Sequence, residues 1–225
     1  MSYEQLLAEI PMFEKLERED VEYLSGRLQQ KRYARDEIIF HQGDVGTALF
    51  IVRKGEVAIR LSSPEGQEVI LTLLSRGDSF GELALLDGQP RSTDAVAREE
   101  THLLILHRED FQHFLSERPA VAKNLLAVLA GMVRRVTQLV HDAAFLNARA
   151  RLARVLLELA RSQGTPVPEG VLLPKCTQAD LAKQCGVTRE SVNRWLRFYA
   201  QERVIDSQRG RIVLLQMEQL RQDVN

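Results

Sequence analysis

One long helical pattern, from Pro119 to Leu146, limits what this chain can fold into. Its apolar residues recur at alternating steps of four and three, as on one face of an α-helix, and a second set widens the stripe. The first set is Leu125, Leu129, Met132, Val136, Leu139, Ala143 and Leu146, and the second is Leu126, Val133 and Val140. A helix that only covers its own domain needs one stripe. The second stripe therefore predicts a parallel helix from another copy, hence a homodimer, with burial inside a larger monomer as the alternative.

The residues before this helix predict an all-β barrel or sandwich. Short apolar stretches, EIIF, ALFIVR, EVAIRL, EVILTLL and HLLILH, are separated by the turn sequences QGDVG, KG, SPEGQ and SRGDSF. Helical sequences, EREDVEYLSGRLQQ and REDFQHFLSERP, lie on either side of these strands. We expect a β-barrel domain over residues 1–118, a dimerisation helix over 119–146 and a third domain over 147–225.

The residues after the long helix predict a winged helix-turn-helix. Asn147 is a candidate N-cap of the helix ARARLARVLLELARS, and QGTPVPEG has the composition of a flexible connection after it. Thr177 with Asp180 indicates a capping box, Gly186 ends that helix, and Thr188 caps the next one. The sequence VIDSQRGRIVLL then reads as a β-hairpin, which would form the wing.

The second helix of this pair has a polar face suited to reading DNA. At about 100° per residue, its apolar residues share one arc and its charged residues share another. The apolar arc holds Val192, Trp195, Leu196 and Tyr199, and the charged arc holds Arg189, Glu190, Arg194 and Arg197. Arg can donate two hydrogen bonds to guanine and Glu can accept one from cytosine, whereas a solvated charged face is the alternative. Residues 148–225 also hold 13 Lys and Arg against 8 Asp and Glu, which suits a nucleic-acid partner.

The order of barrel, long helix and winged helix-turn-helix resembles the bacterial cyclic-AMP receptor protein and fumarate-nitrate reductase regulator superfamily across essentially the whole chain. FHQGDVGTALFIVRKGEVAI is similar to the barrel signature of that superfamily, and GVTRESVNRWL to its recognition helix. The resemblance implies an α+β fold with an N-terminal cyclic-nucleotide-binding β-barrel (jelly roll), a long dimerisation helix and a C-terminal winged helix-turn-helix. It implies that Arg189, Glu190 and Arg194 read bases, with Thr177, Gln178, Thr188 and Arg197 as candidate phosphate contacts.

The stretch FGELALLDGQPRST is similar to the phosphate-binding cassette of cyclic-nucleotide domains. By that resemblance Arg91 donates to the cyclic phosphate, helped by Ser92 and by backbone N–H groups of a short helix that opens at Leu83. Gly81 is expected to allow close approach of the ligand, and Glu82 to accept a hydrogen bond from the ribose 2′-hydroxyl. An ion pair between Glu82 and Arg91, with no ligand, is the alternative.

The end of the cavity that would meet the base is predicted from the long helix. Where cyclic-AMP-binding relatives carry a Thr followed by a Ser or Asn, this chain holds Val136 and Thr137, and the Arg that braces the cassette Glu falls near Met132. Thr137 is a candidate contact to the base, and Arg134 or Arg135 a candidate replacement for the brace. Cyclic AMP is the predicted allosteric ligand, and another cyclic nucleotide or no ligand at all are the alternatives.

These patterns predict a homodimeric cytoplasmic transcription regulator that binds double-stranded DNA at an inverted repeat. The resemblance implies TGTGA-like half-sites, with RNA polymerase as a further partner. The opening MSYEQLLAEIPMF is unlike a signal peptide, and no apolar run approaches the roughly 18 residues of a membrane span, so no membrane partner is expected. Cys176 and Cys185 are too few for a zinc or iron–sulfur site, so no metal is expected. With no nucleotide-transfer loop and no clustered His, Cys and Asp set, we expect no enzyme. A regulator controlled by its abundance, with a vestigial cassette, is the alternative.

Overall fold

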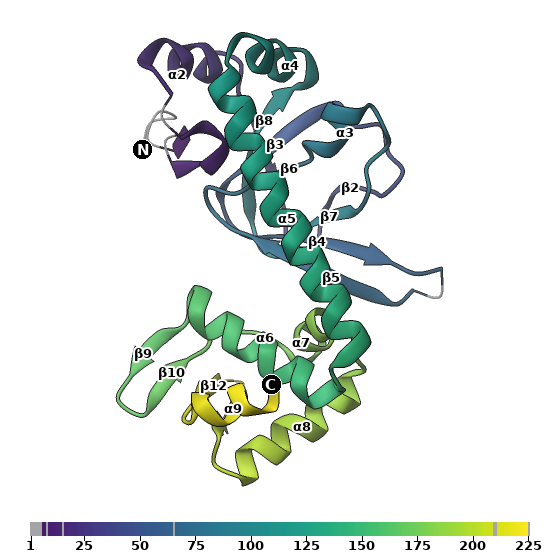
Figure 1. Ribbon diagram of the computed structural model, residues 1–225, viewed down its shortest axis with the longest axis vertical. Helices are drawn as coiled ribbons and strands as arrows, with labels where there is room; N and C mark the ends of the chain where they lie inside the picture. Colours follow the sequence, from purple (N-terminus) through teal and green to yellow (C-terminus); the bar gives the residue numbers. More distant parts are fainter. Residues whose placement is uncertain (1–5, 8, 15, 65, 209–210, 225) are drawn as a thin grey trace. The chain divides into compact units, whose positions relative to one another are not determined.

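The computed structural model describes residues 6–7, 9–14, 16–64, 66–208 and 211–224 (Figure 1). Its contacts divide the chain into two compact units, Met1–Val136 and Thr137–Asn225. The long helix α5, Pro119–Phe145, contributes residues to both units, and the sequence predicted it to within one residue. No helix in the described part of the chain is long and apolar enough to cross a membrane.

The first unit is built on two four-stranded antiparallel sheets, as in a jelly roll (Figure 1). The first sheet has the order β1 (Gln29–Tyr33), β8 (Thr101–His107), β3 (Ala48–Lys54) and β6 (Ser79–Phe80). The second has the order β2 (Ile38–Phe40), β7 (Asp94–Ala97), β4 (Val57–Ser62) and β5 (Glu68–Leu74). The mixed helix and sheet content confirms the predicted fold class.

Strand β3 shows why the barrel strands read as unbroken apolar runs. Successive side chains of a strand point to opposite faces. Phe50 and Val52 lie in the core enclosed by the strands, whereas Leu49 and Ile51 lie in a second core with the helices of this unit. Both faces of β3 are therefore covered by protein.

The second core is covered by helical elements. They include η1 (Pro11–Phe13), α2 (Arg18–Ser25), α4 (Arg108–Glu117) and the first turns of α5. Phe13 and Phe114 meet edge to face with ring centroids 6.1 Å apart, and Leu125 of α5 is 3% exposed. These helices cover the face of β3 and β8 that is opposite the core enclosed by the strands.

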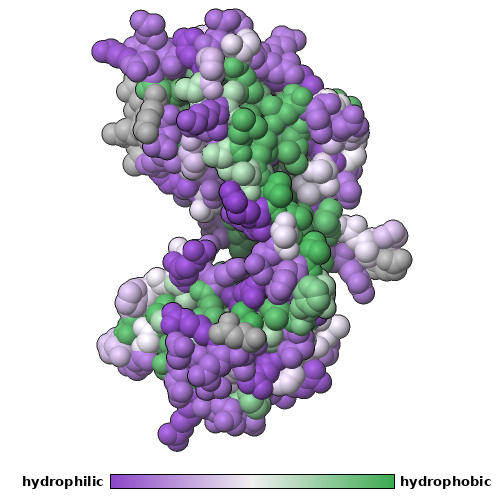
Figure 2. All heavy atoms as spheres, in the orientation of Figure 1, coloured by the Kyte–Doolittle hydropathy of each residue, from purple (hydrophilic) through white to green (hydrophobic). Residues whose placement is uncertain are grey.

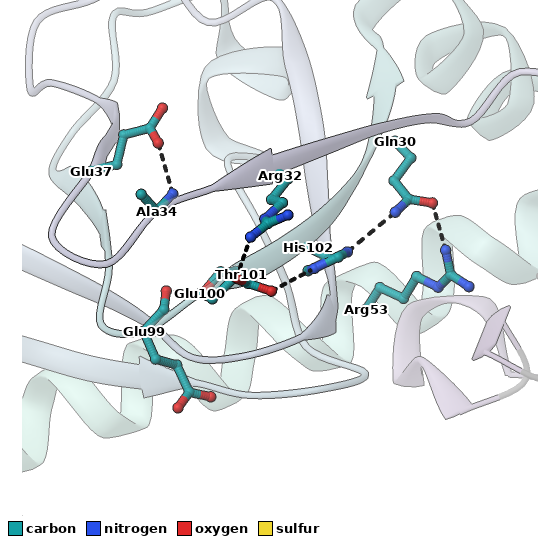
Figure 3. Close-up of polar contacts among 9 residues, drawn as sticks. All are labelled: Gln30, Arg32, Ala34, Glu37, Arg53, Glu99, Glu100, Thr101 and His102. Atoms are coloured by element: carbon teal, nitrogen blue, oxygen red, sulfur yellow. Dashed lines mark hydrogen bonds and ion pairs between the residues drawn. The ribbon is translucent and has the colours of Figure 1, made fainter.

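The prediction of helix up to Gln30 was wrong, because α2 ends at Ser25 and Gln29 begins β1. Strand β1 is polar, so its sequence carries no alternation of apolar residues. Pairing with β8 sets the conformation of this strand. Gln30 Nε2 lies 3.3 Å from His102 Nδ1, and Arg32 pairs with Glu100 (Figure 3). Strands β6 and β7 were also missed, because they are too short to show a period of two.

Part of the apolar surface of α5 is uncovered (Figure 2). Leu126, Val133 and Val140 are 63 to 67% exposed, and they recur every seven residues. Leu125, on the first predicted stripe, is buried in the helical core instead. Burial along the first stripe decreases toward the C-terminal half of α5, where Val136 is 50% exposed and Ala143 is exposed as well.

The second unit is a helix-turn-helix with a small sheet. Its elements are α6 (Ala148–Gln163), β9 (Thr165–Val167), β10 (Gly170–Leu172), α7 (Gln178–Cys185), α8 (Arg189–Gln201), β11 (Ile205–Gln208), β12 (Arg211–Leu214) and α9 (Met217–Val224). The sheet order is β11-β12-β10-β9, so the predicted wing hairpin is confirmed, with residues 209 and 210 of its turn outside the described residues. The prediction of a flexible connection after α6 was wrong, because half of that segment lies in strands, with Thr165–Val167 forming β9 and Gly170 beginning β10. Strands of three residues are defined by their partners, since they are too short for a pattern of their own.

Candidate functional site

The cassette contains α3 (Leu83–Asp87), a short helix that is anchored by side chains of α4. Arg108 Nη2 donates to the Ala84 carbonyl oxygen over 2.9 Å, and Gln112 Nε2 donates to the Leu85 carbonyl oxygen over 2.9 Å. The Leu85 side chain is fully buried in the helical core. These contacts anchor α3 from one side and leave its other side to face the barrel.

Arg91 points into the barrel and is only 5% exposed. Its Nη1 donates to the Gly81 carbonyl oxygen over 2.5 Å, and its Nη2 donates to the Ala48 carbonyl oxygen over 2.7 Å. The guanidinium carbon lies 4.4 Å from the ring centroid of Phe40 and 5.5 Å from that of Phe50. Gly81 has a φ of +86°, and a Cβ there would come within 2.6 Å of Arg91 Nη1, so this approach requires glycine. The sequence places these two aromatic residues only in the predicted strands EIIF and ALFIVR.

Glu82 lies in the same environment and is 3% exposed. Among the described residues, its Oε2 and the Nε of Arg91 are buried without a hydrogen-bond partner, and no salt bridge within 4.0 Å joins the two side chains. Burial raises the pKa of Glu82, and the nearby Arg91 charge opposes that rise. The closed Glu82–Arg91 ion pair, which was the alternative to a ligand site, is not formed in this structure.

These side chains line a cavity of about 810 Å³, a volume suited to a small ligand. The predicted residues in its lining are Gly81, Glu82, Leu83, Arg91 and Ser92. Helix α5 contributes Met132, Arg135 and Val136, and Arg135 Nη1 donates to Thr72 Oγ1 over 2.5 Å. Thr137 is exposed and does not line this cavity, and the same holds for Arg134.

The helix-turn-helix has the caps that the sequence predicted. Asp180 N donates to Thr177 Oγ1 over 3.1 Å while Thr177 N donates to Asp180 Oδ2 over 3.1 Å, which completes the capping box. Gly186 follows α7 in the left-handed conformation at φ +61°, and Thr188 Oγ1 accepts a hydrogen bond from Ser191 N over 3.2 Å. The turn between α7 and α8 is therefore set by local hydrogen bonds.

Helix α8 divides into the two predicted faces. Val192, Leu196 and Tyr199 are buried in the core of the second unit, and Trp195 is half-buried beside them. All four predicted charged residues are exposed, namely Arg189, Glu190, Arg194 and Arg197. They line a concave surface that borders an open pocket of about 730 Å³. Gln178 and Asn193 belong to the same surface, and the sequence reasoning missed Asn193.

The carboxylate of Asp223, in α9, forms hydrogen bonds that hold the buried face of α8 against α6. Asp223 of α9 accepts hydrogen bonds from Tyr199 Oη over 2.6 Å and from Arg149 Nε over 2.9 Å. The Arg149 guanidinium also lies 4.7 Å from the ring centroid of Phe198. One acidic side chain thus joins α6, α8 and α9, and helps to hold the concave surface in place.

Comparisons with known proteins match both units. The cyclic nucleotide-binding domain matches residues 30–118, and the Crp-like helix-turn-helix domain matches residues 150–223. The cyclic AMP receptor protein of Thermus thermophilus is 38% identical over 195 residues, which cover 87% of this chain and 88% of that protein. The chain belongs to the CRP/FNR family.

Further relatives agree with membership of the CRP/FNR family. A CRP-like cAMP-activated global transcriptional regulator of Mycobacterium tuberculosis is 32% identical over 200 residues, 88% of each chain. A solved CooA variant from Carboxydothermus hydrogenoformans has a TM-score of 0.77 at 25% identity, with 89% of each chain covered. These homologues are transcription regulators and not enzymes. This CRP/FNR protein is therefore a DNA-binding transcription regulator with a cyclic nucleotide-binding domain.

Within this CRP/FNR protein, the predicted site residues fall into two groups in space. The cassette residues share the barrel cavity, and the charged residues of α8 share the concave surface with Gln178. Thr177 caps the N-terminus of α7, and Thr188 caps the N-terminus of α8. Asn193 could have been found from the sequence, because it lies on the same arc of α8 as the arginines.

Proposed function

We propose that this CRP/FNR protein is a homodimeric regulator whose DNA binding is controlled by cyclic AMP in the barrel cavity. The observation that carries the proposal is the pair of buried opposite charges, Glu82 and Arg91, whose Oε2 and Nε atoms have no hydrogen-bond partner among the described residues. Buried polar atoms are ordinarily paired, and an exception is explained by strain, by a bound water or ion, or by a role in binding. A cyclic nucleotide offers both missing partners, a phosphate anion for Arg91 and a ribose hydroxyl donor for Glu82.

Arg91 is prepared for an anion by its own contacts. Two of its five N–H groups are engaged by the Gly81 and Ala48 carbonyl oxygens, which fix the plane of the guanidinium. Its Nε–H and remaining terminal N–H groups are then available to phosphate oxygens, with Ser92 as a neutral donor nearby in the same lining. Little side-chain entropy is lost on binding, because the geometry exists beforehand.

Cyclic AMP is chosen as the ligand because the relatives from Thermus thermophilus and Mycobacterium tuberculosis bear cyclic-AMP names. The α5 side of the cavity offers Arg135 and Thr72 as polar groups for the base. Thr137 stays a predicted base contact. Cyclic GMP and cyclic di-GMP are the comparison ligands that test this choice.

The dimer is proposed from the uncovered apolar face of α5. Leu126, Val133 and Val140 form a stripe with the seven-residue period of a helix pair, and an exposed apolar stripe of this kind indicates a partner surface. Two copies related by a two-fold axis bring two α8 helices to an inverted repeat, with half-site centres about 34 Å apart. We propose TGTGA-like half-sites, with RNA polymerase as a further partner.

Ligand binding is tested by thermal shift and isothermal titration with cyclic AMP, cyclic GMP and cyclic di-GMP. Wild type should be stabilised by cyclic AMP. Arg91→Lys keeps the charge but loses the planar set of donors, so we expect at least a tenfold weaker affinity for cyclic AMP. If no cyclic nucleotide stabilises wild type, the cassette is structural and the abundance-controlled alternative is correct.

DNA recognition is tested by selection of binding sites from random DNA. Glu190→Ala should relax the preference at one base pair per half-site by about 1 to 3 kcal/mol and barely change non-specific binding. Arg197→Ala should weaken all sequences alike and reduce the salt slope by about one unit, as expected for a phosphate contact. If wild type selects no inverted repeat when cyclic AMP is present, the proposed function is refuted.

A further inference from the structure

Asn193 of α8 is joined to Gln178 of α7 across the helix-turn-helix. Asn193 Nδ2 donates a hydrogen bond to Gln178 Oε1 over 2.9 Å. Both side chains are half-buried, and both line the concave surface that holds the charged residues of α8. At about 100° per residue, Asn193 lies about 40° from Arg189 and about 40° from Arg197. It therefore lies between Arg189 and Arg197 on the arc that we propose reads DNA.

The bond to Gln178 determines which atoms of the Asn193 amide remain for another partner. A primary amide has two N–H donors and one carbonyl acceptor. Gln178 engages one of the two N–H groups, so one donor and the carbonyl acceptor remain. Adenine presents the complementary pair in the major groove, because its N7 accepts and its N6 donates. Neither Arg, with donors only, nor an ionised Glu, with acceptors only, offers this combination.

Gln178 is placed to orient that amide. It is the first residue of α7, directly after the Thr177 cap, and the capping box fixes the backbone at this point. Because its carbonyl oxygen accepts from Asn193, its NH₂ group is the end left for a DNA phosphate at the helix N-terminus. A phosphate contact through Gln178 and a base contact through Asn193 would thus support each other.

We propose that Asn193 is a specificity-determining residue that reads an adenine in each half-site, and that Gln178 is its positioning residue. The inference rests on the proposed function, since it requires α8 in the major groove. It adds a base contact beyond those assigned to the charged residues of α8.

The test is selection of binding sites from random DNA by the full-length protein with saturating cyclic AMP. Asn193→Ala should reduce the preference for adenine at one position per half-site by about 5- to 150-fold and leave the other positions unchanged. Asn193→Asp keeps an acceptor and loses the donor, so the preferred base at that position should change from adenine to cytosine. Gln163→Ala is the matched control, because it removes an exposed carboxamide at the end of α6, and its selected sequences should match those of wild type.

Gln178→Ala tests the positioning role. It should lower the preference at the same base pair by less than Asn193→Ala does, and the double variant should match Asn193→Ala there, because the two side chains act as a unit. Thermal melting monitored by circular dichroism checks that each variant is folded. If wild type selects an inverted repeat but the Asn193 variants change only the melting temperature and no base preference, the inference is overturned and the proposed function stands. If wild type selects no inverted repeat, both are overturned.

Discussion

Glu82→Gln should stabilise the ligand-free protein and weaken its binding of cyclic AMP. The substitution keeps the shape of a side chain that is 3% exposed and removes a buried charge whose Oε2 has no hydrogen-bond partner among the described residues. An unpaired buried polar atom costs about 1 to 3 kcal/mol, and a neutral amide costs less to bury than a carboxylate. We expect a gain of about 1 kcal/mol in the free energy of unfolding, or about 2 to 4 °C in melting temperature for a chain of this size.

The gain has a defined dependence on pH. Burial raises the pKa of Glu82 above its ordinary value of 4.5, so the folded chain binds this proton more tightly than the unfolded chain. The stability of wild type therefore rises, as far as Glu82 is concerned, when the pH falls through the folded pKa toward 4.5. The advantage of Glu82→Gln should be largest at pH values above the folded pKa of Glu82 and should shrink as Glu82 becomes protonated.

Ligand binding should change in the opposite direction. A hydrogen bond from the ribose hydroxyl to a carboxylate contributes about 1.5 to 3 kcal/mol, against about 0.5 to 1.5 kcal/mol for a neutral acceptor. Replacing the carboxylate should therefore cost about 1 to 1.5 kcal/mol, which is roughly a 5- to 12-fold weaker affinity for cyclic AMP.

Melting temperatures from pH 5 to pH 9, with and without cyclic AMP, and isothermal titration at pH 8 measure both effects. Glu99→Gln is the control, because that side chain is exposed and its substitution should change neither quantity (Figure 3). A Glu82→Gln variant that melts below wild type without ligand at pH 8, while the control is unchanged, would refute the burial argument. An unchanged affinity for cyclic AMP would refute the assigned contact to the ribose.

Three further predictions concern the dimer, the hydrogen bonds of Asp223 and the cysteines. Val133→Glu on the exposed stripe of α5 should yield a monomer in sedimentation that no longer binds an inverted repeat, and a wild type that is itself monomeric at micromolar concentration would contradict the dimer. Asp223→Asn should lower the free energy of unfolding by about 2 kcal/mol in urea, because Tyr199 and α6 lose a charged acceptor, and an unchanged midpoint would argue against a stabilising role for these hydrogen bonds. Burial raises the pKa of Cys176 to about 11 and that of Cys185 to about 12, so both thiols should react slowly with a thiol reagent at pH 8 until urea unfolds the chain. Rapid labelling of the folded protein would contradict that burial.

The features predicted correctly from sequence are those specified by neighbouring residues. The long helix follows from a repeat every three or four positions, and the caps at Thr177, Gly186 and Thr188 follow from backbone hydrogen bonds within one turn. The two faces of α8 follow from the same helical period. Each pattern is complete within a few residues, so no knowledge of the rest of the chain was needed.

The features that sequence reasoning missed depend on residues far apart in the chain. Strand β1 is polar and forms because β8, about seventy positions later, pairs with it. The strands β9 and β10 are too short to carry a period and are defined by their pairing with each other and with β12. Propensity and alternation are weak for such segments, and the partner strand decides their conformation.

The sequence alone determined the order of the domains, the residues of the cassette and the charged face of α8, because each depends on a contiguous stretch of residues. Only the tertiary structure decided that the Arg91 guanidinium is held by the Ala48 carbonyl oxygen, that Glu82 is left without a partner, and that Asn193 is tied to Gln178. These facts depend on distances and burial between segments that meet only after folding. A one-dimensional pattern carries no record of which polar atoms find a partner, since burial and hydrogen bonding are properties of the packed chain.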